Sequence, residues 1–240
     1  MDIRRYVGQF RLDRVLVGIL VLLAAAVAAL VWLDENPQHN PWAPLDLRDP
    51  PGRATAMKLV TLRAEPQQCR AVLARSQVAF ETLAPAGEGP CRREDRVIVD
   101  GLVMSPQTPA TTCAIGAAAH HWLVRSVKPA AREILGSDLS KVEHFGAYSC
   151  RRLYGRGTGG WSEHATGNAL DIAAFVLADG RRIALIDAWG GEGAEAKFLR
   201  AVRDDACAIF GTVLSPDYNS AHRDHFHFDQ ARRGYRGVCR

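Results

Sequence analysis

Two short segments of the chain contain the side-chain types that bind metal ions in proteins. Residues 162–171 read Ser-Glu-His-Ala-Thr-Gly-Asn-Ala-Leu-Asp, so that His164 precedes Asp171 by seven residues. Residues 222–229 read His-Arg-Asp-His-Phe-His-Phe-Asp and contain the His-x-His pair His225 and His227. Two imidazoles and one carboxylate form a ligand set that suits a catalytic zinc ion with an open fourth position. We therefore expect one of the two downstream histidines to join His164 and Asp171 at a metal centre.

The alternative is that these histidines are ordinary surface or core residues. Against it, four of the eight histidines of the chain fall in the two segments, together with Asp171, Asp224 and Asp229. A structural zinc site is disfavoured because such sites are usually closed by four protein ligands rich in cysteine, and neither segment contains a cysteine.

The local sequence indicates how the two segments fold. Residues 166–168, Thr-Gly-Asn, are typical of a turn, and the apolar run 170–175 is typical of the strand that follows it. In residues 225–229 polar and aromatic residues alternate, which predicts a second strand. A period of two places His225 and His227 on one face of that strand and the two phenylalanines on the other, buried face.

The motifs resemble those of known families. Ser-x-His-x-x-Gly-x-Ala-x-Asp at 162–171, with Asp-His-x-His at 224–227, resembles the zinc peptidases that cleave D-Ala-containing peptides of bacterial cell walls. That group also includes lysostaphin-like enzymes and the hedgehog signalling domain. Tyr-Ser-Cys-Arg at 148–151 and Pro-Asp-Tyr-Asn at 216–219 are closer to the bacterial extensin-like C-terminal domain family. The similarity covers about residues 65–239, and the chain lacks the Ser-Pro-Pro repeats of plant extensins.

This resemblance implies a zinc-dependent peptidase acting on peptidoglycan stem peptides or cross-links. It implies His164, Asp171 and His227 as the zinc ligands, with water at the fourth position. Zinc lowers the pKa of such a water toward about 7 and polarises the scissile carbonyl group.

The resemblance also implies roles for residues that do not bind the metal. Asp224, three residues before His227, stands where the peptidases have their general base, which requires it to lie on the loop before the strand. His225 would orient or stabilise the tetrahedral intermediate. Arg151 would neutralise the oxyanion, with Arg152 as the alternative because the local spacing differs from that of the family. Glu163 and its neighbour Ser162 are expected to position other groups rather than to act as nucleophiles.

Two other functional classes are alternatives to a peptidase. A non-catalytic domain that binds or scaffolds the cell wall could retain the same fold and metal, although here the ligand set and the expected base are both intact. A hydrolase of sugars or esters is disfavoured, since the sequence has no convincing carboxylate pair or nucleophile elbow. Nucleic-acid binding has no support: the net charge of +4 is modest and the basic residues are scattered.

Residues 15–33 predict a membrane-spanning helix. These nineteen residues carry no charge, and as a helix they span about 28 Å, close to the thickness of the bilayer core. Arginines precede the span and two acidic residues follow it, so the positive-inside rule places residues 1–14 in the cytoplasm and the remainder in the periplasm, on the inner membrane. A cleaved signal peptide is the alternative.

The rest of the chain is expected to form one tethered domain. Residues 34–57 contain five of the twelve prolines and predict a semi-extended tether. Residues 58–240 predict an α+β domain with a hedgehog/D-Ala-D-Ala peptidase-like fold, in which helices flank a small, largely antiparallel sheet. The expected helices are 65–83, 112–127, 129–135 and 192–210, with a break or kink at Pro129 and an end at Gly136. The expected strands are 96–104, 142–150, 170–175, 180–186 and 225–229.

Six dispersed cysteines agree with an oxidising compartment and predict three disulfides. Six cysteines allow 15 pairings, which the sequence cannot separate. Pairing in chain order gives the expectation Cys69–Cys91, Cys113–Cys150 and Cys207–Cys239, and free buried thiols are the alternative.

Overall fold

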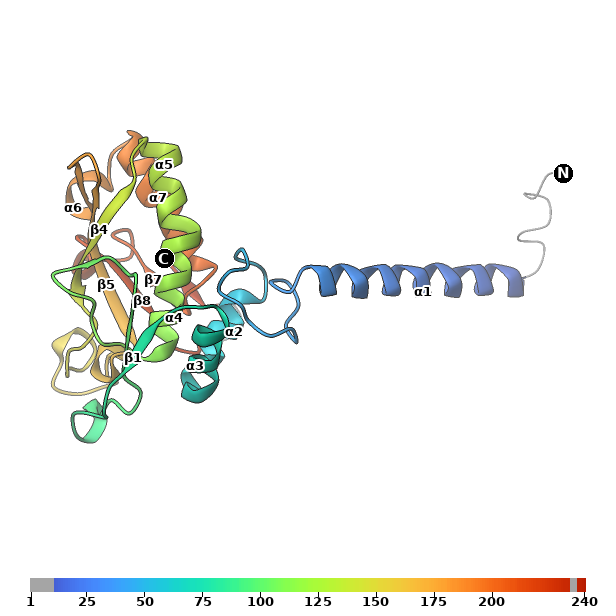
Figure 1. The fold of residues 1–240 in the computed structure, drawn as a ribbon, viewed down its shortest axis with the longest axis horizontal. Coiled ribbons are helices and arrows are strands. Elements are labelled where there is room, and N and C mark those ends of the chain that lie inside the picture. The colour runs from blue at the N-terminus through green and yellow to red at the C-terminus, as the bar shows by residue number, and fades with distance from the viewer. Residues whose placement is uncertain (1–10, 234–236) are drawn as a thin grey trace.

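The computed structural model describes residues 11–233 and 237–240 and has an α+β fold with one helix projecting from it (Figure 1). The projecting helix is α1, Arg11–Glu35. Its segment Leu12–Glu35 is long and apolar enough to cross a membrane, and none of that segment is buried. Arg4 and Arg5, which contribute to the orientation expected from the positive-inside rule, lie outside the described residues.

The main sheet has seven strands in the order β3-β4-β5-β8-β7-β9, with β6 paired to β5. Only the β3/β4 and β7/β9 pairs are parallel, so the sheet is largely antiparallel, as expected. The expectation of a small sheet is wrong, because the sheet also contains β7 and β9, which no expected strand covers. With three and two residues, these strands are too short to show a period of two. The bounds are β3 Met104–Ser105, β4 Leu139–Gly146, β5 Ala169–Leu177, β6 Arg182–Ala184, β7 Thr212–Leu214, β8 Phe226–Asp229 and β9 Val238–Cys239.

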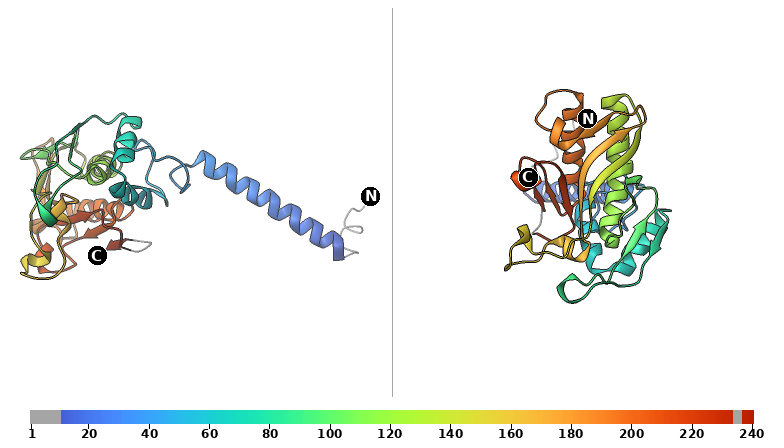
Figure 2. Two further views of the ribbon diagram at one scale, coloured as in Figure 1. Left: turned by 90° about the horizontal axis from the view of Figure 1, so that it is seen from below. Right: turned by 90° about the vertical axis from the view of Figure 1, so that its left-hand side faces the viewer.

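Helices cover one face of this sheet and loops cross the other (Figures 1 and 2). The helix expected over 65–83 ends at Arg75, because Gln77 takes a left-handed conformation with φ of 59°. The chain then enters β1, Phe80–Thr82, which pairs antiparallel with β2, Val97–Val99. The helices are α2 Thr55–Thr61, α3 Pro66–Arg75, α4 Cys113–Trp122, α5 Lys128–Leu135, α6 Leu185–Ala188 and α7 Ala194–Cys207.

Pro129 does not break the helical path between α4 and α5. A π-helical turn, Leu123–Val127, joins the two helices instead. Proline has no N–H to donate and its ring would clash with the carbonyl four residues earlier, so a wider turn just before it relieves both problems. The expected end of α5 is confirmed: Gly136 has the left-handed conformation, with φ of 68°.

An aromatic cluster around Trp122 fastens the helices to the sheet. The Trp122 ring meets the rings of Phe175, Phe210 and Phe228 edge-on at centroid distances of 5.1–6.4 Å. Its indole N–H donates to the Val202 carbonyl at 2.8 Å, so the one polar atom of this buried ring is satisfied. Because the two phenylalanines of β8 are buried on this helical face, the alternating residues of β8 face the opposite side of the sheet.

A bulge in β5 separates the core from the opposite face. Glu143 of β4 pairs with Ala174 and the next residue, His144, pairs with Ile172, so Ala173 has no partner on β4. An extra residue of this kind shifts the alternation of side chains by one. Phe175 can thus pack on the helical face although Asp171, four residues earlier, faces the other side.

The proline-rich segment after α1 is partly packed against the domain. Leu45 and Leu47 belong to the hydrophobic core. The Leu47 N–H donates to the Ser76 hydroxyl at 2.8 Å, and its carbonyl lies 3.0 Å from Nδ1 of His121. Only the first part of the segment 34–57 is therefore free of the core.

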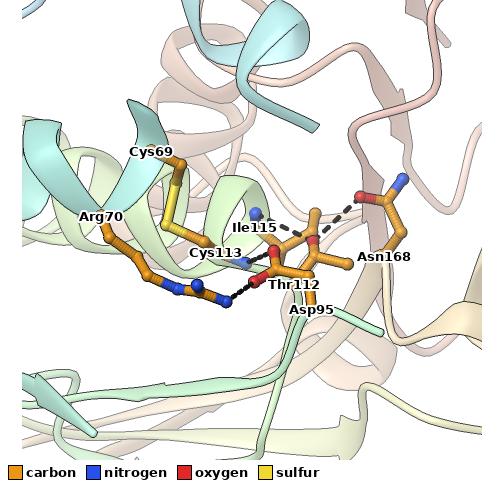
Figure 3. Close-up of a disulfide and its surroundings, with 7 residues drawn as sticks. All are labelled: Cys69, Arg70, Asp95, Thr112, Cys113, Ile115 and Asn168. Atoms are coloured by element: carbon orange, nitrogen blue, oxygen red, sulfur yellow. Dashed lines mark hydrogen bonds and ion pairs between the residues drawn. A yellow bond between two sulfur atoms is a disulfide. The ribbon is translucent and has the colours of Figure 1, made fainter. Parts of the chain in front are cut away.

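The three disulfides are Cys69–Cys113, Cys91–Cys150 and Cys207–Cys239. The third matches the expected pairing in chain order and the first two correct it. Cys69 lies on α3 against the first residue of α4, Cys113, where Asp95 accepts from the Cys113 N–H and also binds Arg70 (Figure 3). Packing of α3 on α4 therefore decides the partner of Cys69, and sequence distance does not.

Peptide mapping of the oxidised protein should join the Cys69 peptide to the Cys113 peptide. Replacing both cysteines with serine should lower the free energy of unfolding by about 2–4 kcal/mol, because the unfolded chain loses a crosslink that closes a long loop. Urea unfolding of the full chain in neutral detergent measures this change. A Cys69–Cys91 linkage, or six free thiols, would contradict the structure.

Candidate metal centre

The structure brings His164, Asp171 and His227 together on the face of the sheet opposite the helices. Nε2 of His164 lies 3.1 Å from Oδ1 of Asp171 and 3.1 Å from Nδ1 of His227. The same Asp171 oxygen lies 2.9 Å from Nδ1 of His227. The three atoms form a nearly equilateral triangle, and the groups are buried or nearly so.

In each imidazole, the ring nitrogen that points away from the triangle has a partner that can only accept a hydrogen bond. Nδ1 of His164 lies 3.1 Å from the Ala147 carbonyl, which can only accept a hydrogen bond. Nε2 of His227 lies 3.2 Å from the Asp229 carboxylate, which as an anion also can only accept. If each ring carries one proton, on that outer nitrogen, three acceptor atoms face one another. Either a metal cation between them or a second proton on one ring would balance this arrangement.

The residues present fit a zinc ion. Bonds of about 2.0–2.2 Å from zinc to nitrogen and oxygen in a tetrahedron place neighbouring ligand atoms about 3.3 Å apart, and the triangle edges here are 2.9–3.1 Å. Each imidazole also has the outer partner that metal-bound histidines normally have, a backbone carbonyl for His164 and the Asp229 carboxylate for His227. These partners set the tautomer and the ring orientation.

A short helical turn, Glu163–Thr166, delivers His164 to the site. The Ser162 hydroxyl accepts from the His164 N–H at 3.3 Å and caps the turn. Gly167 ends it in the left-handed conformation with φ of 70°, which favours glycine at this position of the motif. The expected turn before β5 is thus present, and Ser162 positions His164 as the sequence suggested.

A polar clamp, in which Asn168 and Arg63 both bind the Glu163 carboxylate, holds this turn against the domain. Nδ2 of Asn168 donates to the Glu163 carboxylate at 2.8 Å, and Arg63 forms an ion pair with the same carboxylate. Asn168 is fully buried, and its Oδ1 accepts from the Thr112 hydroxyl at 3.0 Å (Figure 3). Glu163 is therefore engaged by two partners, which agrees with a positioning role.

The β5/β8 register places the remaining two ligands. Asp171 of β5 is the antiparallel partner of His227 of β8. Directly opposed residues on neighbouring strands have side chains on the same face of the sheet. Position 229 lies two residues beyond His227, so Asp229 faces the same side and reaches the outer nitrogen of His227.

The hydrogen bonds of the cluster shift the pKa values of its members strongly. Burial alone would raise the pKa of Asp171, but its hydrogen bonds with His164 and His227 outweigh burial and hold that pKa well below its usual range. Burial alone would lower the pKa of His227, whereas its hydrogen bonds with Asp171 and Asp229 raise it to about 9. Without a metal, a proton on His227 therefore supplies the positive charge that the triangle requires at neutral pH.

Asp224 lies in the turn before β8, as its expected role requires. Its carboxylate lies 2.9 Å from Nδ1 of His225, and its side chain is 38% exposed. Nε2 of His225 lies 3.8 Å from Oδ1 of Asp171, so the far edge of this imidazole points toward the cluster. The structure thus joins Asp224 to the candidate ligands through His225.

The two candidate arginines differ in their contacts. Arg152 donates to the Gly159 carbonyl and lies over the Trp161 ring at 4.5 Å, so its side chain is engaged by residues 159–161. Arg151 is exposed. Burial and then the charges of His225 and His227 lower the pKa of His222 to about 4, and the positive charge of Arg151 contributes to this shift. The charge of Arg151 therefore acts on His222, whose ring lies next to those of His225 and His227.

Two residues of the cluster, Asp229 and His222, had no predicted role. Asp229 orients His227, and the period of two along β8 was the signal that could have identified it. The His222 ring lies 5.2 Å from that of His225 and 5.9 Å from that of His227, and its Nδ1 contacts Asn219 at 2.8 Å. His222 lies in a short 3-10 turn, where no side-chain periodicity indicates its direction.

Comparison with known families gives one match. The family model described as extensin-like protein C-terminus matches residues 67–240, well over half of the chain. No curated protein and no solved structure matches the chain.

The full chain purified from an oxidising compartment should contain about one zinc ion. Either His164→Ala or His227→Ala should remove the zinc, because the two remaining ligands are too few for a stable site. Elemental analysis measures the content. His144→Ala is the matched control, because His144 lies on β4 and contacts the Gln107 carbonyl. Full zinc occupancy in both ligand variants would overturn the ligand assignment.

Zinc affinity should rise with pH and level off above about pH 9. A group with a raised pKa keeps its proton below that value, so below pH 9 zinc must displace the His227 proton. The affinity should change by up to about tenfold per pH unit, with about one proton released per ion. Calorimetric titration in buffers of different ionisation enthalpy counts the released protons. A pH-independent affinity between pH 6 and 9 would contradict this electrostatic description.

Proposed function

The chain belongs to the extensin-like C-terminal family, and we propose that it is a membrane-anchored, zinc-dependent peptidase that hydrolyses peptide bonds in peptidoglycan stem peptides or cross-links. The observation that carries this proposal is the triangle of three acceptor atoms on His164, Asp171 and His227. A three-ligand site of this composition leaves a coordination position for a reactant, which suits catalysis better than a structural role.

The three ligands would hold zinc, which when bound activates water and polarises a carbonyl group. The outer hydrogen bonds of His164 and His227 keep both rings in the tautomer that presents a free nitrogen. The buried carboxylate of Asp171 supplies negative charge to the same point. These contacts preorganise the site before any substrate arrives.

Asp224 and His225 are proposed to act as a pair. The Asp224 carboxylate fixes the His225 ring through Nδ1, which turns Nε2 toward the cluster. In this arrangement Nε2 of His225 would take the proton of the attacking water, and Asp224 would act as the general base through the imidazole by accepting the Nδ1 proton. The pair would then return one proton to the leaving amine. His225 would also stabilise the tetrahedral intermediate.

Arg151 is proposed to neutralise the oxyanion of that intermediate. A fixed cation beside a partly desolvated site stabilises developing negative charge more than it would in water. The effect of Arg151 on the pKa of His222 indicates that its charge reaches the cluster. Because burial and the neighbouring histidines lower the pKa of His222 to about 4, His222 is neutral at physiological pH and does not repel a cation.

The surroundings of the cluster favour a substrate with apolar groups. Phe145, 62% exposed, packs edge-on against His225 at 5.7 Å. Tyr218, 40% exposed, packs edge-on against His222 at 5.4 Å. Exposed aromatic residues beside a polar site commonly mark a ligand-binding surface. D-Ala-containing peptides, suggested by the motif at 162–171, would meet this rim with their methyl groups.

Peptidoglycan as substrate also agrees with the proposed location. The helix α1 would span the inner membrane through residues 15–33, with the N-terminus in the cytoplasm and the catalytic domain in the periplasm. The three disulfides fit that compartment, because disulfides persist where the environment is oxidising.

Asp224→Asn should retain zinc and lose about 10²- to 10⁴-fold in the rate of muropeptide hydrolysis, since an amide cannot accept the proton of water. His225→Ala should also slow turnover without emptying the site. Mass spectrometry of muropeptides incubated with the full chain, with and without chelator, measures hydrolysis. Asp187→Asn is the control, because Asp187 is an exposed carboxylate on α6.

The outcomes separate the possible errors. Loss of zinc in Asp224→Asn with retention in His227→Ala would mean that ligand and base are exchanged. Full activity of Asp224→Asn would refute the proposed proton transfer. A zinc-loaded wild type that cleaves no muropeptide would instead favour a wall-binding or scaffolding domain.

A further inference from the structure

A surface cavity of about 680 Å³ lies between α2, the end of α7 and the segment that follows β8. None of the candidate metal ligands lines it. The residues that line it include the apolar Met57, Val60 and Phe210 and the basic Arg53, Arg232 and Arg233. The cavity therefore combines an apolar surface with three guanidinium groups.

The positive charge of this cavity is largely uncompensated. No described lining residue is acidic. Within residues 11–233 and 237–240, neither Arg53 nor Arg232 forms an ion pair, and both are exposed. Arg233 contacts the Asp229 carboxylate through one nitrogen at 3.2 Å and remains 44% exposed. Guanidinium groups bind phosphate oxygens with paired hydrogen bonds, so the cavity suits a phosphate group.

A series of contacts holds this cavity near the outer end of α1. The Trp32 ring in the last turn of α1 stacks on the His39 ring at 5.2 Å. Nδ1 of His39 accepts from the backbone N–H of Arg53, a residue of the cavity, at 3.1 Å. Lys58 of α2 also donates to the Pro37 carbonyl at 2.9 Å. Figure 1 shows α2 on the side of the domain from which α1 projects.

We propose that this cavity binds the headgroup of an anionic phospholipid from the bilayer that α1 spans. The arginines would hold the phosphate, and Met57, Val60 and Phe210 would contact the glycerol and the first carbons of the acyl chains. Tryptophan is enriched at the membrane–water interface, which places Trp32, and with it the cavity, at headgroup level. A soluble polyanion would use the arginines but would gain little from the apolar wall. This inference rests on the proposed membrane insertion of α1 and is independent of the peptidase activity.

The test uses the full chain in neutral detergent with phosphatidylglycerol and phosphatidylcholine in equal amounts. Native mass spectrometry should show at least tenfold preference for the anionic lipid, and hydrogen exchange at residues 55–61 should slow when it binds. The double variant Arg53→Glu/Arg232→Glu should lose both effects. Arg233 is left unchanged because it also contacts Asp229.

The matched control is Arg125→Glu/Lys197→Glu, which changes the net charge equally at two exposed positions away from the cavity. It should retain the preference. Met57→Gln should weaken binding of the lipid but not of glycerol phosphate, because Met57 contacts only the apolar part. Equal lipid binding by both double variants would overturn the proposal. So would binding of inorganic phosphate or glycerol phosphate as tight as that of the lipid, since the site would then belong to a soluble anion.

Discussion

The antiparallel register between β5 and β8 is the constraint on which the candidate metal centre depends. It sets Asp171 opposite His227, and a slip of one residue would turn one of these side chains to the other face of the sheet. The apolar side of β8 prevents that slip, because Phe226 and Phe228 are fully buried and stack on each other. Phe228 also stacks on Phe210, and Phe226 meets the Trp189 ring edge-on. The hydrophobic core thus specifies the polar site on the reverse of the same strands.

Charged groups buried around the cluster are compensated in pairs. Glu163 is held by Arg63 and Asn168, and Asp229 by His227 and Arg233. An isolated buried charge would be strongly unfavourable, whereas a charge that is paired and hydrogen-bonded can be tolerated. Removing one partner would leave the other unpaired, so these groups constrain each other. These contacts hold Glu163, the neighbour of His164, and orient the His227 ring.

Features whose side-chain directions follow from local backbone geometry could be predicted from the sequence, and short strands that depend on their neighbours could not. The alternation in residues 225–229 and the turn at 166–168 indicated the arrangement of the candidate ligands, because side-chain direction there follows from local backbone geometry. The size of the sheet could not be foreseen, since strands such as β3 and β9 have two residues and exist only through their neighbours. The π-helical turn before Pro129 likewise depends on packing that the sequence does not display.

Some contacts of the candidate site also could not be predicted from local sequence patterns. The contact of Asp224 with His225 and the clamp from Arg63 to Glu163 join groups whose directions are set by turns or by residues about a hundred positions apart. The predicted disulfide partners of Cys69 and Cys91 are wrong for the same reason, because tertiary contacts decide them. Cys69 meets Cys113 where α3 approaches α4, and Cys91 meets Cys150 where the turn Gly89–Cys91 approaches the segment after β4. Sequence distance alone favoured shorter loops that the fold does not use.

The interleaved disulfides have a consequence for how the protein matures. Cys69, Cys91, Cys113 and Cys150 are synthesised in that order, and an oxidant that acts before folding meets first the neighbours that close the shorter, incorrect loops. The native bonds, Cys69–Cys113 and Cys91–Cys150, cross each other along the chain. Reaching them from the early products requires thiolate attack on an existing disulfide and passage through a mixed intermediate. The yield of correctly folded protein should therefore depend on disulfide isomerisation, and not on oxidation alone.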